Sequence, residues 1–487
     1  MRRSVIAYIV GRVLLLEAAL LLLPVLIAII NQESQRQIMS YFLVAVGLCL
    51  IGYIFSKSKP EAIQVKTHDG IITVAILWIL ISFFGALPLV FTGEVPNIVD
   101  AFFEMSSGFT TTGSSIISDL SVIGQSTIFW RSFTHFIGGM GVLVFMLAIL
   151  PSGSNTVNLM KAEVPGPVFG KLLSRTQNTA RILYLLYTAM TIVLILILIF
   201  LKVPILDAFN LAFGTAGTGG FGISNEGFSK YTNQAAVEWV IGIGMLFFGV
   251  NFNVYYYIML GYVKDVFKND EELRYYILIV LTITALIILN TFNRYQLAEP
   301  VIRNVFFTVS SIITTTGYAT TDFNQWPLFS HILLLFLMFC GGCAGSTAGG
   351  LKVSRVIIYF KSWLSEIRRA VQPKRMVMTL MSNKPITKDL EMNVTNYLLV
   401  YIVVFIAILL SVSLEAPDFL TAFSTVAATF NNIGPGLGQV GPMNDFSVYS
   451  NWNTLVLSFG MIAGRLEIYP ILILFSPKTL RHLTKGY

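Results

Sequence analysis

The chain has 487 residues, of which 55% are hydrophobic and only 12% are charged, and its formal net charge is +7. A soluble globular domain carries about 25% charged residues, so this composition argues against a soluble protein and indicates a polytopic membrane protein. The basic residues are dispersed along the flanks of apolar runs instead of forming one patch, which argues against nucleic-acid binding.

Apolar runs long enough to cross a bilayer, which takes about 20 residues, predict about ten membrane-spanning helices. The first run is too long for a cleavable signal peptide and lacks a small-residue cleavage site. One further run, near 327–350, is interrupted by glycines. The uninterrupted runs lie near 5–30, 39–56, 70–92, 123–150, 181–202, 235–262, 275–291, 394–414 and 449–475.

The Lys and Arg residues are distributed unevenly among the connections between these runs. Most lie on one side, including nine between Lys352 and Lys388, and few lie on the other. By the positive-inside rule both termini are predicted to be cytoplasmic in the cell (inner) membrane. Topology or contact with lipid headgroups explains the long basic stretch, which is also the best candidate for a surface that docks a soluble regulator.

The most informative feature is a fourfold repeat. A Phe is followed eleven residues later by a Gly, inside a run rich in Thr, Ser and small residues, and a Pro lies five or six residues before each Phe. Self-similarity of this kind predicts repeated structural units, and four such loops around one axis are what a cation filter of backbone carbonyls requires. The pairs are Phe102 and Gly113, Phe209 and Gly220, Phe306 and Gly317, and Phe423 and Gly434.

The residues before each loop predict a short helix that enters the membrane without crossing it. Pro suits the first helical turn because its missing N–H would be unpaired there, and Asp100, Asp207 and Asp418 lie where a carboxylate favours a helix N-terminus. A helix of about 10 to 12 residues spans about 15–18 Å, half of the ~30 Å hydrocarbon layer. Its partially negative C-terminal end would therefore point to mid-membrane and stabilise a dehydrated cation.

The loops themselves are the predicted cation site. Gly is needed where the backbone must reach φ values that a Cβ forbids, and close helix packing is the alternative explanation for small residues in any single run. In the second copy Gly219 could be the aligned glycine, although the equal spacing of eleven favours Gly220. The predicted carbonyl donors are Thr111, Thr112, Gly113, Thr218, Gly219, Gly220, Thr315, Thr316, Gly317, Asn432, Ile433 and Gly434.

These features predict an all-α integral membrane fold with four helix–pore-loop–helix repeats around a pseudo-fourfold pore. The first two apolar runs have only a short polar connection between them and no Gly loop, so they form an extra N-terminal hairpin outside the repeat. The predicted boundaries are 1–66 for the hairpin and 67–160, 161–268, 269–385 and 386–487 for the four pore units.

The interrupted apolar run contains a second irregular segment. The stretch from Pro327 to Cys340 would form only about 21 Å of helix, too short to cross, and five glycines follow within ten residues. A kinked helix packed on small residues is one interpretation, but irregular backbone at this depth favours a flexible flap that faces the pore. The predicted gating residues of this flap are Gly341, Gly342, Gly345, Ser346, Thr347, Gly349 and Gly350.

A lone arginine, Arg465, lies within the last apolar run, with Glu467 two residues later. An Arg at the membrane centre costs about 2.5–3.5 kcal/mol on insertion scales, so it should face a cavity and have partners. We predict that Arg465 bonds carbonyl groups of the flap and forms a barrier below the filter. A snorkelling arginine, or a structural pair with Glu467, is the alternative.

Three further features have structural interpretations. Cys340 and Cys343 have a CxxC spacing, but no His or further Cys lies nearby, which favours packing over a redox or metal role. His135 is predicted to be a packed, hydrogen-bonded helix residue. Glu104, in the first re-entrant helix, could orient the filter from behind or attract cations, and the sequence leaves both open.

Several of these stretches resemble a known family. The runs SSGFTTTG, TAGTGGFG, SSIITTTGYATTDF and TVAATFNNIGPGLGQVGP resemble the four pore loops of TrkH/TrkG-type potassium uptake subunits. Three other stretches, FWRSFTHFIGGMGV, CGGCAGSTAGGLKVSR and GRLEIYP, are also similar to family segments. The resemblance covers essentially the whole chain, and the extra hairpin favours the Trk branch over the shorter KtrB branch.

The resemblance implies that the transported ion is potassium, because in this superfamily a Ser in place of the first-loop Gly goes with sodium preference and this chain has Gly113. It also implies an intramembrane gating loop, a homodimer in membrane lipid, and a cytosolic, nucleotide-binding TrkA-like ring as partner. The chain itself contains no nucleotide-binding motif. K⁺ at the filter would be the transported ion, and no covalently bound cofactor is implied.

We therefore expect potassium uptake through a channel-like filter, gated by the flap, Arg465 and a cytosolic partner. The nearest rival is a K⁺ symporter coupled to H⁺ or Na⁺, which the lack of a buried carboxylate pair weakens. A membrane enzyme is the rival of another class. The membrane-depth stretches offer no clustered His, carboxylates or Ser/His arrangement, so the sequence predicts no enzyme.

Overall fold

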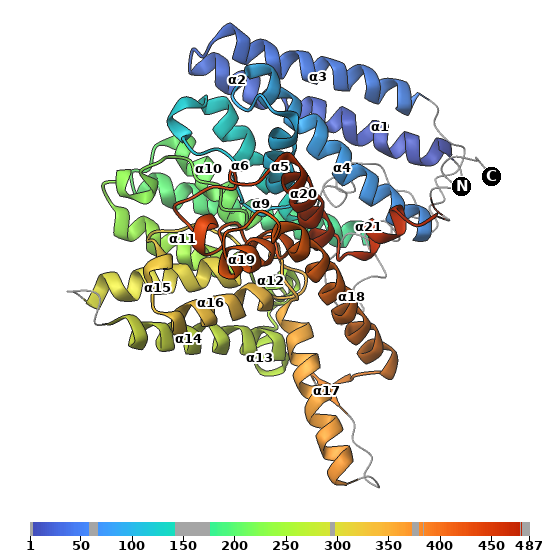
Figure 1. The fold of residues 1–487 in the computed structure, drawn as a ribbon, viewed down its shortest axis with the longest axis vertical. Helices are drawn as coiled ribbons and strands as arrows, with labels where there is room; N and C mark the ends of the chain where they lie inside the picture. Colours follow the sequence, from blue (N-terminus) through green and yellow to red (C-terminus); the bar gives the residue numbers. More distant parts are fainter. Residues whose placement is uncertain are drawn as a thin grey trace.

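The protein is described by a computed structural model. Within the part of the chain that the structure describes, almost all regular structure is helical, which confirms the predicted fold class (Figure 1). Strands β1 (Leu380–Met381) and β2 (Lys384–Pro385) form the single, two-stranded antiparallel sheet of that part. The described residues are 3–57, 67–141, 176–292, 298–372, 379–382, 384–477 and 479.

The N-terminal hairpin lies at one end of the molecule (Figure 1, blue). Pro24 lies in the first turn of its second helix, and the missing N–H of proline explains why the first predicted span is divided into two helices. Gly11 and Gly52 let the hairpin helices approach closely, because a Cβ on Gly11 would lie 2.7 Å from the carbonyl oxygen of Gly52. The hairpin consists of α1 (Arg3–Leu20), α2 (Leu22–Ile30) and α3 (Gln35–Ser56).

Four sets of helices follow the hairpin, each with a short re-entrant helix as its second member. Three of the four re-entrant helices contain 12 or 13 residues, and α15 contains 16. The sets are α4 (Thr67–Thr92), α5 (Ile98–Phe109) and α6 (Gln125–Gly139); α9 (Thr176–Phe200), α10 (Ile205–Gly217) and α11 (Gln234–Phe248); α14 (Glu271–Thr291), α15 (Ala298–Ile313) and α16 (Leu328–Cys340); and α18 (Lys388–Val412), α19 (Phe419–Phe430) and α20 (Asn451–Arg465).

The helix starts follow the predicted chemistry with local differences. Asp100 and Asp207 lie in the first turns of α5 and α10, but the side chain that caps α5 belongs to Asn97. Asp418 caps α19, where the backbone N–H and the hydroxyl of Thr421 donate to its carboxylate and hold the pKa of Asp418 below its usual value. Two re-entrant helices, α5 and α19, therefore begin with a side chain that accepts from an unpaired backbone N–H, whereas α10 and α15 have an acidic residue in the first turn, Asp207 and Glu299.

Several predicted spans are broken. Six of the described helices are long and apolar enough to cross a membrane. The run near 235–262 is not one straight helix, because α11 and α12 (Phe252–Met259) meet at 89°. The run near 449–475 is divided into α20 and α21 (Tyr469–Leu474), and residues 142–150 of the run near 123–150 lie outside the described residues. The count of about ten spans therefore includes helices that are individually too short to cross.

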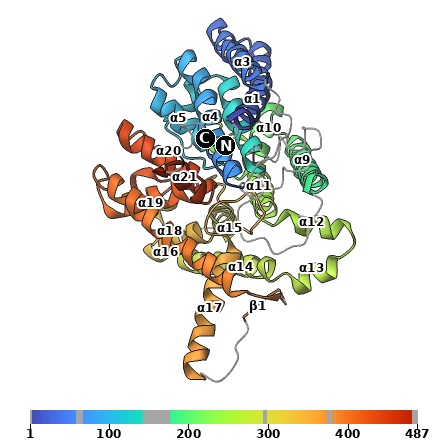
Figure 2. The same ribbon diagram turned by 90° about the vertical axis from the view of Figure 1, so that its right-hand side faces the viewer.

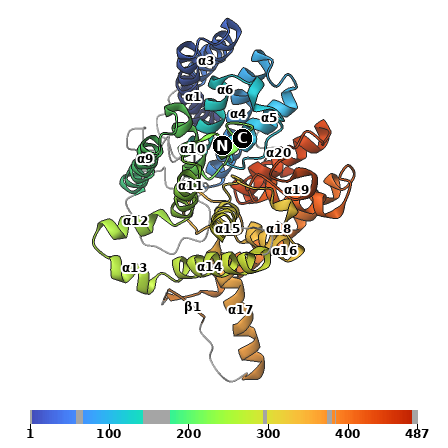
Figure 3. The ribbon, with the colours of Figure 1, turned by 90° about the vertical axis from the view of Figure 1, so that its left-hand side faces the viewer.

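Three helices lie at the periphery of the main body. Helix α17 (Val353–Val371) extends away from it at one end, as Figures 1 and 2 show. Helices α12 and α13 (Val263–Asn269) lie at the edge of the molecule in Figures 2 and 3.

Each pore loop is followed by a short 3₁₀ turn before the next long helix, namely Leu120–Val122, Gly227–Lys230, Phe323–Gln325 and Gly438–Val440.

Candidate ion pathway

All four re-entrant helices end in the same backbone motif. The residue two positions before the repeated Gly is left-handed in each copy, with φ of 56°, 56°, 55° and 57° at Thr111, Thr218, Thr315 and Asn432. The backbone N–H of the residue after it donates to the carbonyl oxygen five residues earlier, in the last turn of the helix. This is the Schellman arrangement of helix ends. These bonds run from Thr112 N to Ser107 O (2.8 Å), Gly219 N to Gly214 O (2.9 Å), Thr316 N to Ser311 O (2.8 Å) and Ile433 N to Ala428 O (2.8 Å).

Three of these left-handed positions are occupied by Thr, although a β-branched residue with positive φ is a genuine outlier. Gly or Asn is usual at such a helix end, so each Thr stores strain on the order of 1–3 kcal/mol. Side-chain bonds hold two of the four left-handed residues, Thr315 and Asn432. Gly349 N donates to Thr315 Oγ1 over 2.6 Å, and Asn432 Nδ2 donates to Thr112 Oγ1 over 2.9 Å. Strain of this kind is typical of functional sites.

The repeated glycines also share one conformation. Gly113, Gly220, Gly317 and Gly434 have φ of 83°, 64°, 88° and 108°, where only Gly fits without strain. Gly219 is not among the residues with positive φ. The equivalent position in the second loop is therefore that of Gly220, as the equal spacing of eleven residues predicted.

The four loops form a closed ring. A Cβ built on Gly113 would lie 1.9 Å from the carbonyl oxygen of Gly219, so the first loop contacts the second. The same construction gives 2.0 Å from Gly220 to Thr316 O, 2.1 Å from Gly317 to Ile433 O, and 3.0 Å from Gly434 to Thr112 O. Each Gly thus abuts the carbonyl of the residue before the next Gly, and the fourth loop returns to the first.

A buried ion pair supports the ring from behind. Arg131 Nε lies 2.7 Å from Glu104 Oε1, and both side chains are almost completely buried. Glu104 also accepts from the backbone N–H of Ile116 (2.9 Å), and Arg131 donates to Ser115 Oγ (3.1 Å) and to Gly222 O (3.3 Å). Of the two roles left open for Glu104, orientation of the loops fits this geometry, because its carboxylate is buried and paired.

Glu104→Gln is expected to destabilise the protein by about 3–5 kcal/mol, because removing one partner leaves a buried charge uncompensated. Thermal unfolding of the purified protein, followed by tryptophan fluorescence, measures the loss. Glu366→Gln is the matched control, since Glu366 pairs with Arg369 at an exposed position and should change stability by less than about 1 kcal/mol. Equal effects of the two substitutions would contradict a supporting role for Glu104.

His135 is a packed, hydrogen-bonded residue, as predicted. Its Nδ1 lies 2.8 Å from the carbonyl oxygen of Gly108, and the N–H of Phe221 lies 3.3 Å from its Nε2. Its ring packs against Phe221, with 4.3 Å between the ring centroids. A Cβ on Gly219 would collide with this ring at 2.2 Å, so the close approach of His135 requires a glycine there.

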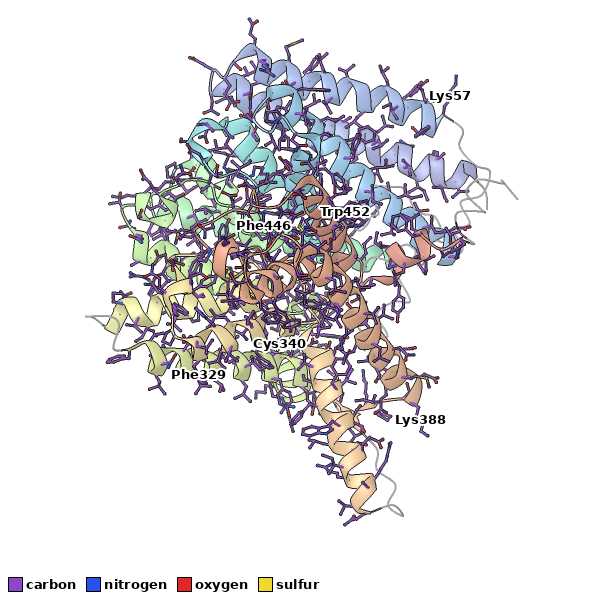
Figure 4. The ribbon with its side chains drawn as sticks, viewed as in Figure 1. Lys57, Phe329, Cys340, Lys388, Phe446 and Trp452 are labelled. Atoms are coloured by element: carbon purple, nitrogen blue, oxygen red, sulfur yellow. The ribbon has the colours of Figure 1, made fainter. Side chains whose placement is uncertain are left out.

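The glycine-rich flap of residues 341–350 lies against the ring. Cys340, the last residue of α16, is near the middle of the molecule (Figure 4), and irregular backbone follows it. The bond from Gly349 N to Thr315 Oγ1 ties the flap to the third loop. A Cβ on Gly349 would lie 2.3 Å from Asn431 O, so the flap also touches the fourth loop.

Arg465 joins the flap to another helix. Its Nη1 donates to Thr347 O over 2.7 Å, so it bonds a carbonyl group of the flap. Its Nη2 donates to Gly138 O and Gly139 O, each over 2.7 Å, at the end of α6. Glu467 forms an ion pair with Arg355, at 2.6 Å. Arg465 therefore connects three segments that are distant in the sequence.

Sequence reasoning missed two buried charges beside the flap. One oxygen of Glu272 accepts from Ala344 N (2.7 Å) and from Ser354 N (3.0 Å). Lys352, which the sequence placed at the start of a basic connection, is buried and donates to Ala348 O. A charge directly after an irregular membrane segment was the available signal for Lys352, whereas nothing distinguishes Glu272 from its acidic neighbours in the sequence.

Comparison with known proteins agrees with this geometry. Residues 36–481 match the family model described as TrkH, cation transport protein. The chain is 34% identical to the Trk system potassium uptake protein TrkH of Salmonella typhimurium, over 97% of this chain and 98% of that protein. It is 33% identical to the Trk system potassium uptake protein TrkG of Escherichia coli, over 97% of each chain.

A solved structure is similar over nearly the whole length. The crystal structure of the potassium transporter TrkH from Vibrio parahaemolyticus superposes with a TM-score of 0.87 and 29% sequence identity, covering 99% of this chain and 100% of that one. The family match, the two relatives and the shared fold point to the same conclusion. The chain belongs to the TrkH family of cation transport proteins.

Proposed function

We propose that this protein takes up K⁺ across the cell membrane through the ring of four loops, in a channel-like way. The closed ring is the observation that carries the proposal, because it brings together four equivalent backbone segments from distant parts of the chain. The relatives named as potassium uptake proteins support K⁺ as the ion.

Carbonyl oxygens of the loops would replace the hydration shell of the ion. The proposed donors are Thr111, Thr112 and Gly113 with their equivalents in the other three loops, as the sequence predicted. The four re-entrant helices end at these loops, so the partially negative helix ends would add a favourable potential for a cation. Irregular backbone at membrane depth also fits a cavity-lining position.

The flap and Arg465 would close this path on the far side of the filter. The bond from Gly349 N to Thr315 Oγ1 holds the flap against the ring, and the bond from Arg465 to Thr347 O holds it to the end of α20. A guanidinium beside the path repels cations. Opening would require these bonds to break together, which makes the flap a two-state element of the kind that gating needs.

A cytosolic regulatory ring of the TrkA kind is the proposed partner, acting on a homodimer whose termini are cytoplasmic. The projecting helix α17 supports this, because it carries exposed apolar side chains together with Arg368 and Arg369 in its last turn. An exposed patch of this sort on a helix that leaves the main body is suited to protein binding. This surface lies in the basic stretch that the sequence singled out.

Ion flux into proteoliposomes tests the proposal. Radioactive Rb⁺ should enter passively at a clamped K⁺ diffusion potential, and Na⁺ should enter much more slowly. Gly113→Ser should raise the ratio of Na⁺ to Rb⁺ flux several-fold, because its Cβ would displace the carbonyl of Gly219. Rb⁺ entry that requires a pH or Na⁺ gradient would identify a coupled symporter instead.

A further inference from the structure

The break between α11 and α12 begins a segment that we call the elbow, residues 249–270, which connects α11 to α14. The break has a local cause. Gly249 is at the C-terminal end of α11, and the Asn251 side chain accepts from Asn253 N over 3.0 Å to cap α12. The chain thus stops one helix and starts another within three residues.

The start of the elbow and the first turn of α14, directly after the elbow, together bind three consecutive flap residues. At the start of the elbow, Gly249 O accepts from Cys343 N (2.9 Å), and Phe252 N donates to Gly345 O (3.2 Å). Directly after the elbow, Glu272 in the first turn of α14 accepts from Ala344 N. The start of the elbow and the first turn of α14 therefore form a bracket around residues 343–345, so a movement of either would disturb the bonds that hold the start of the flap.

The outer surface of the elbow is apolar. Val266 packs inward, whereas six large apolar or aromatic side chains are exposed, including Met259 (70%) and Phe267 (52%). Lys264 and Lys268 are exposed on α13, as is Asp265, while the carboxylate of Asp270 caps α14. The six exposed side chains are Tyr257, Met259, Leu260, Tyr262, Val263 and Phe267.

We propose that this surface lies in the headgroup layer of the bilayer and binds phospholipid. The elbow leads directly into α14, a candidate span whose Leu278 and Leu281 are exposed, so its apolar surface continues a surface that faces lipid. Tyrosines at membrane interfaces and Lys ammonium groups that reach lipid phosphates are typical of such positions. On the proposed topology this is the cytoplasmic leaflet.

The consequence, which rests on the proposed gating role of the flap, is that lipid contact sets the position of the flap. A lipid-anchored bracket holds residues 343–345 and so favours the closed arrangement. Weaker contact between the elbow and lipid should therefore loosen the flap and raise K⁺ flux in the absence of any partner. Lipid would then be a regulator that acts through the elbow.

A fluorescence experiment tests lipid contact independently of flux. The exposed Cys49 is replaced by Ser, leaving the buried Cys340 and Cys343, and Phe267→Cys is labelled with an environment-sensitive probe. In vesicles of brominated phosphatidylglycerol the probe should be clearly quenched, although less than one at Leu281→Cys, which lies midway along the candidate span α14. A probe at Met443, exposed in the loop region after the fourth pore loop, should not be quenched.

Quenching at position 267 as weak as at position 443 would overturn the proposal. Formation of a disulfide-linked dimer through Phe267→Cys would also overturn it, because the surface would then contact a second copy of the chain. Flux then tests the coupling. Met259→Gln with Phe267→Gln should raise basal Rb⁺ flux about threefold or more, and the control Val122→Gln should leave it unchanged. Strong quenching with unchanged flux would keep the lipid site and reject its link to the flap.

Discussion

Replacing Arg465 with Ala is expected to raise K⁺ flux by at least about tenfold. A unit charge close to the path raises the energy of a cation by on the order of 2–4 kcal/mol at an effective dielectric constant of about 20, and each ~1.4 kcal/mol taken from a barrier is about tenfold in rate. The substitution also removes the donor that holds Thr347 O. Rb⁺ uptake into proteoliposomes, normalised to the amount of folded protein, measures the effect.

Arg465→Lys separates charge from geometry. Lys keeps the positive charge but cannot bond the flap and the two carbonyls of α6 in the same forked arrangement. We expect its flux to lie between those of wild type and Arg465→Ala. Arg36→Ala is the control for loss of an arginine elsewhere, because Arg36 donates to Phe91 O at an exposed site. Unchanged or slower flux in a folded Arg465→Ala protein would reject the barrier.

Gly220→Ala is expected to reduce Rb⁺ flux to less than about a tenth of the wild-type rate. Its φ of 64° costs a residue with a Cβ about 1–2 kcal/mol. The larger effect is steric, since the added Cβ would lie 2.0 Å from Thr316 O and would force the second and third loops apart. The same flux assay measures the result, with thermal unfolding as the check on folding.

The chain offers a matched control for backbone strain alone. Gly227 has a φ of 58°, but a Cβ there would have no neighbour within 4 Å. Gly227→Ala should therefore lose a little stability and keep its flux. Gly434→Ala should be intermediate, because its Cβ would lie 3.0 Å from Thr112 O. Equal loss of flux in Gly220→Ala and Gly227→Ala would mean that strain, and not contact between loops, controls the ring.

The features that the sequence predicted correctly are those that depend on residues close together in the chain. The spacing between Phe and Gly placed all four helix ends and identified Gly220 over Gly219, because a left-handed residue followed by a positive-φ Gly depends on neighbouring residues alone. Hydropathy found most membrane helices for the same reason. It missed the break at residues 249–251 because the run stays apolar through the turn, although the Gly and Asn that end and cap the helices were local cues.

The sequence by itself determined the class of protein, the fourfold repeat and the register of the pore loops. Only the tertiary structure decided which loops touch, that Glu104 pairs with Arg131 behind them, and that Arg465 bridges the flap and α6. These contacts join residues that are tens to hundreds of positions apart in the chain. Such pairings are set by how helices pack in space, which no pattern of neighbouring residues specifies. The candidate site could therefore be placed from the sequence, but the side-chain contacts that hold it could not.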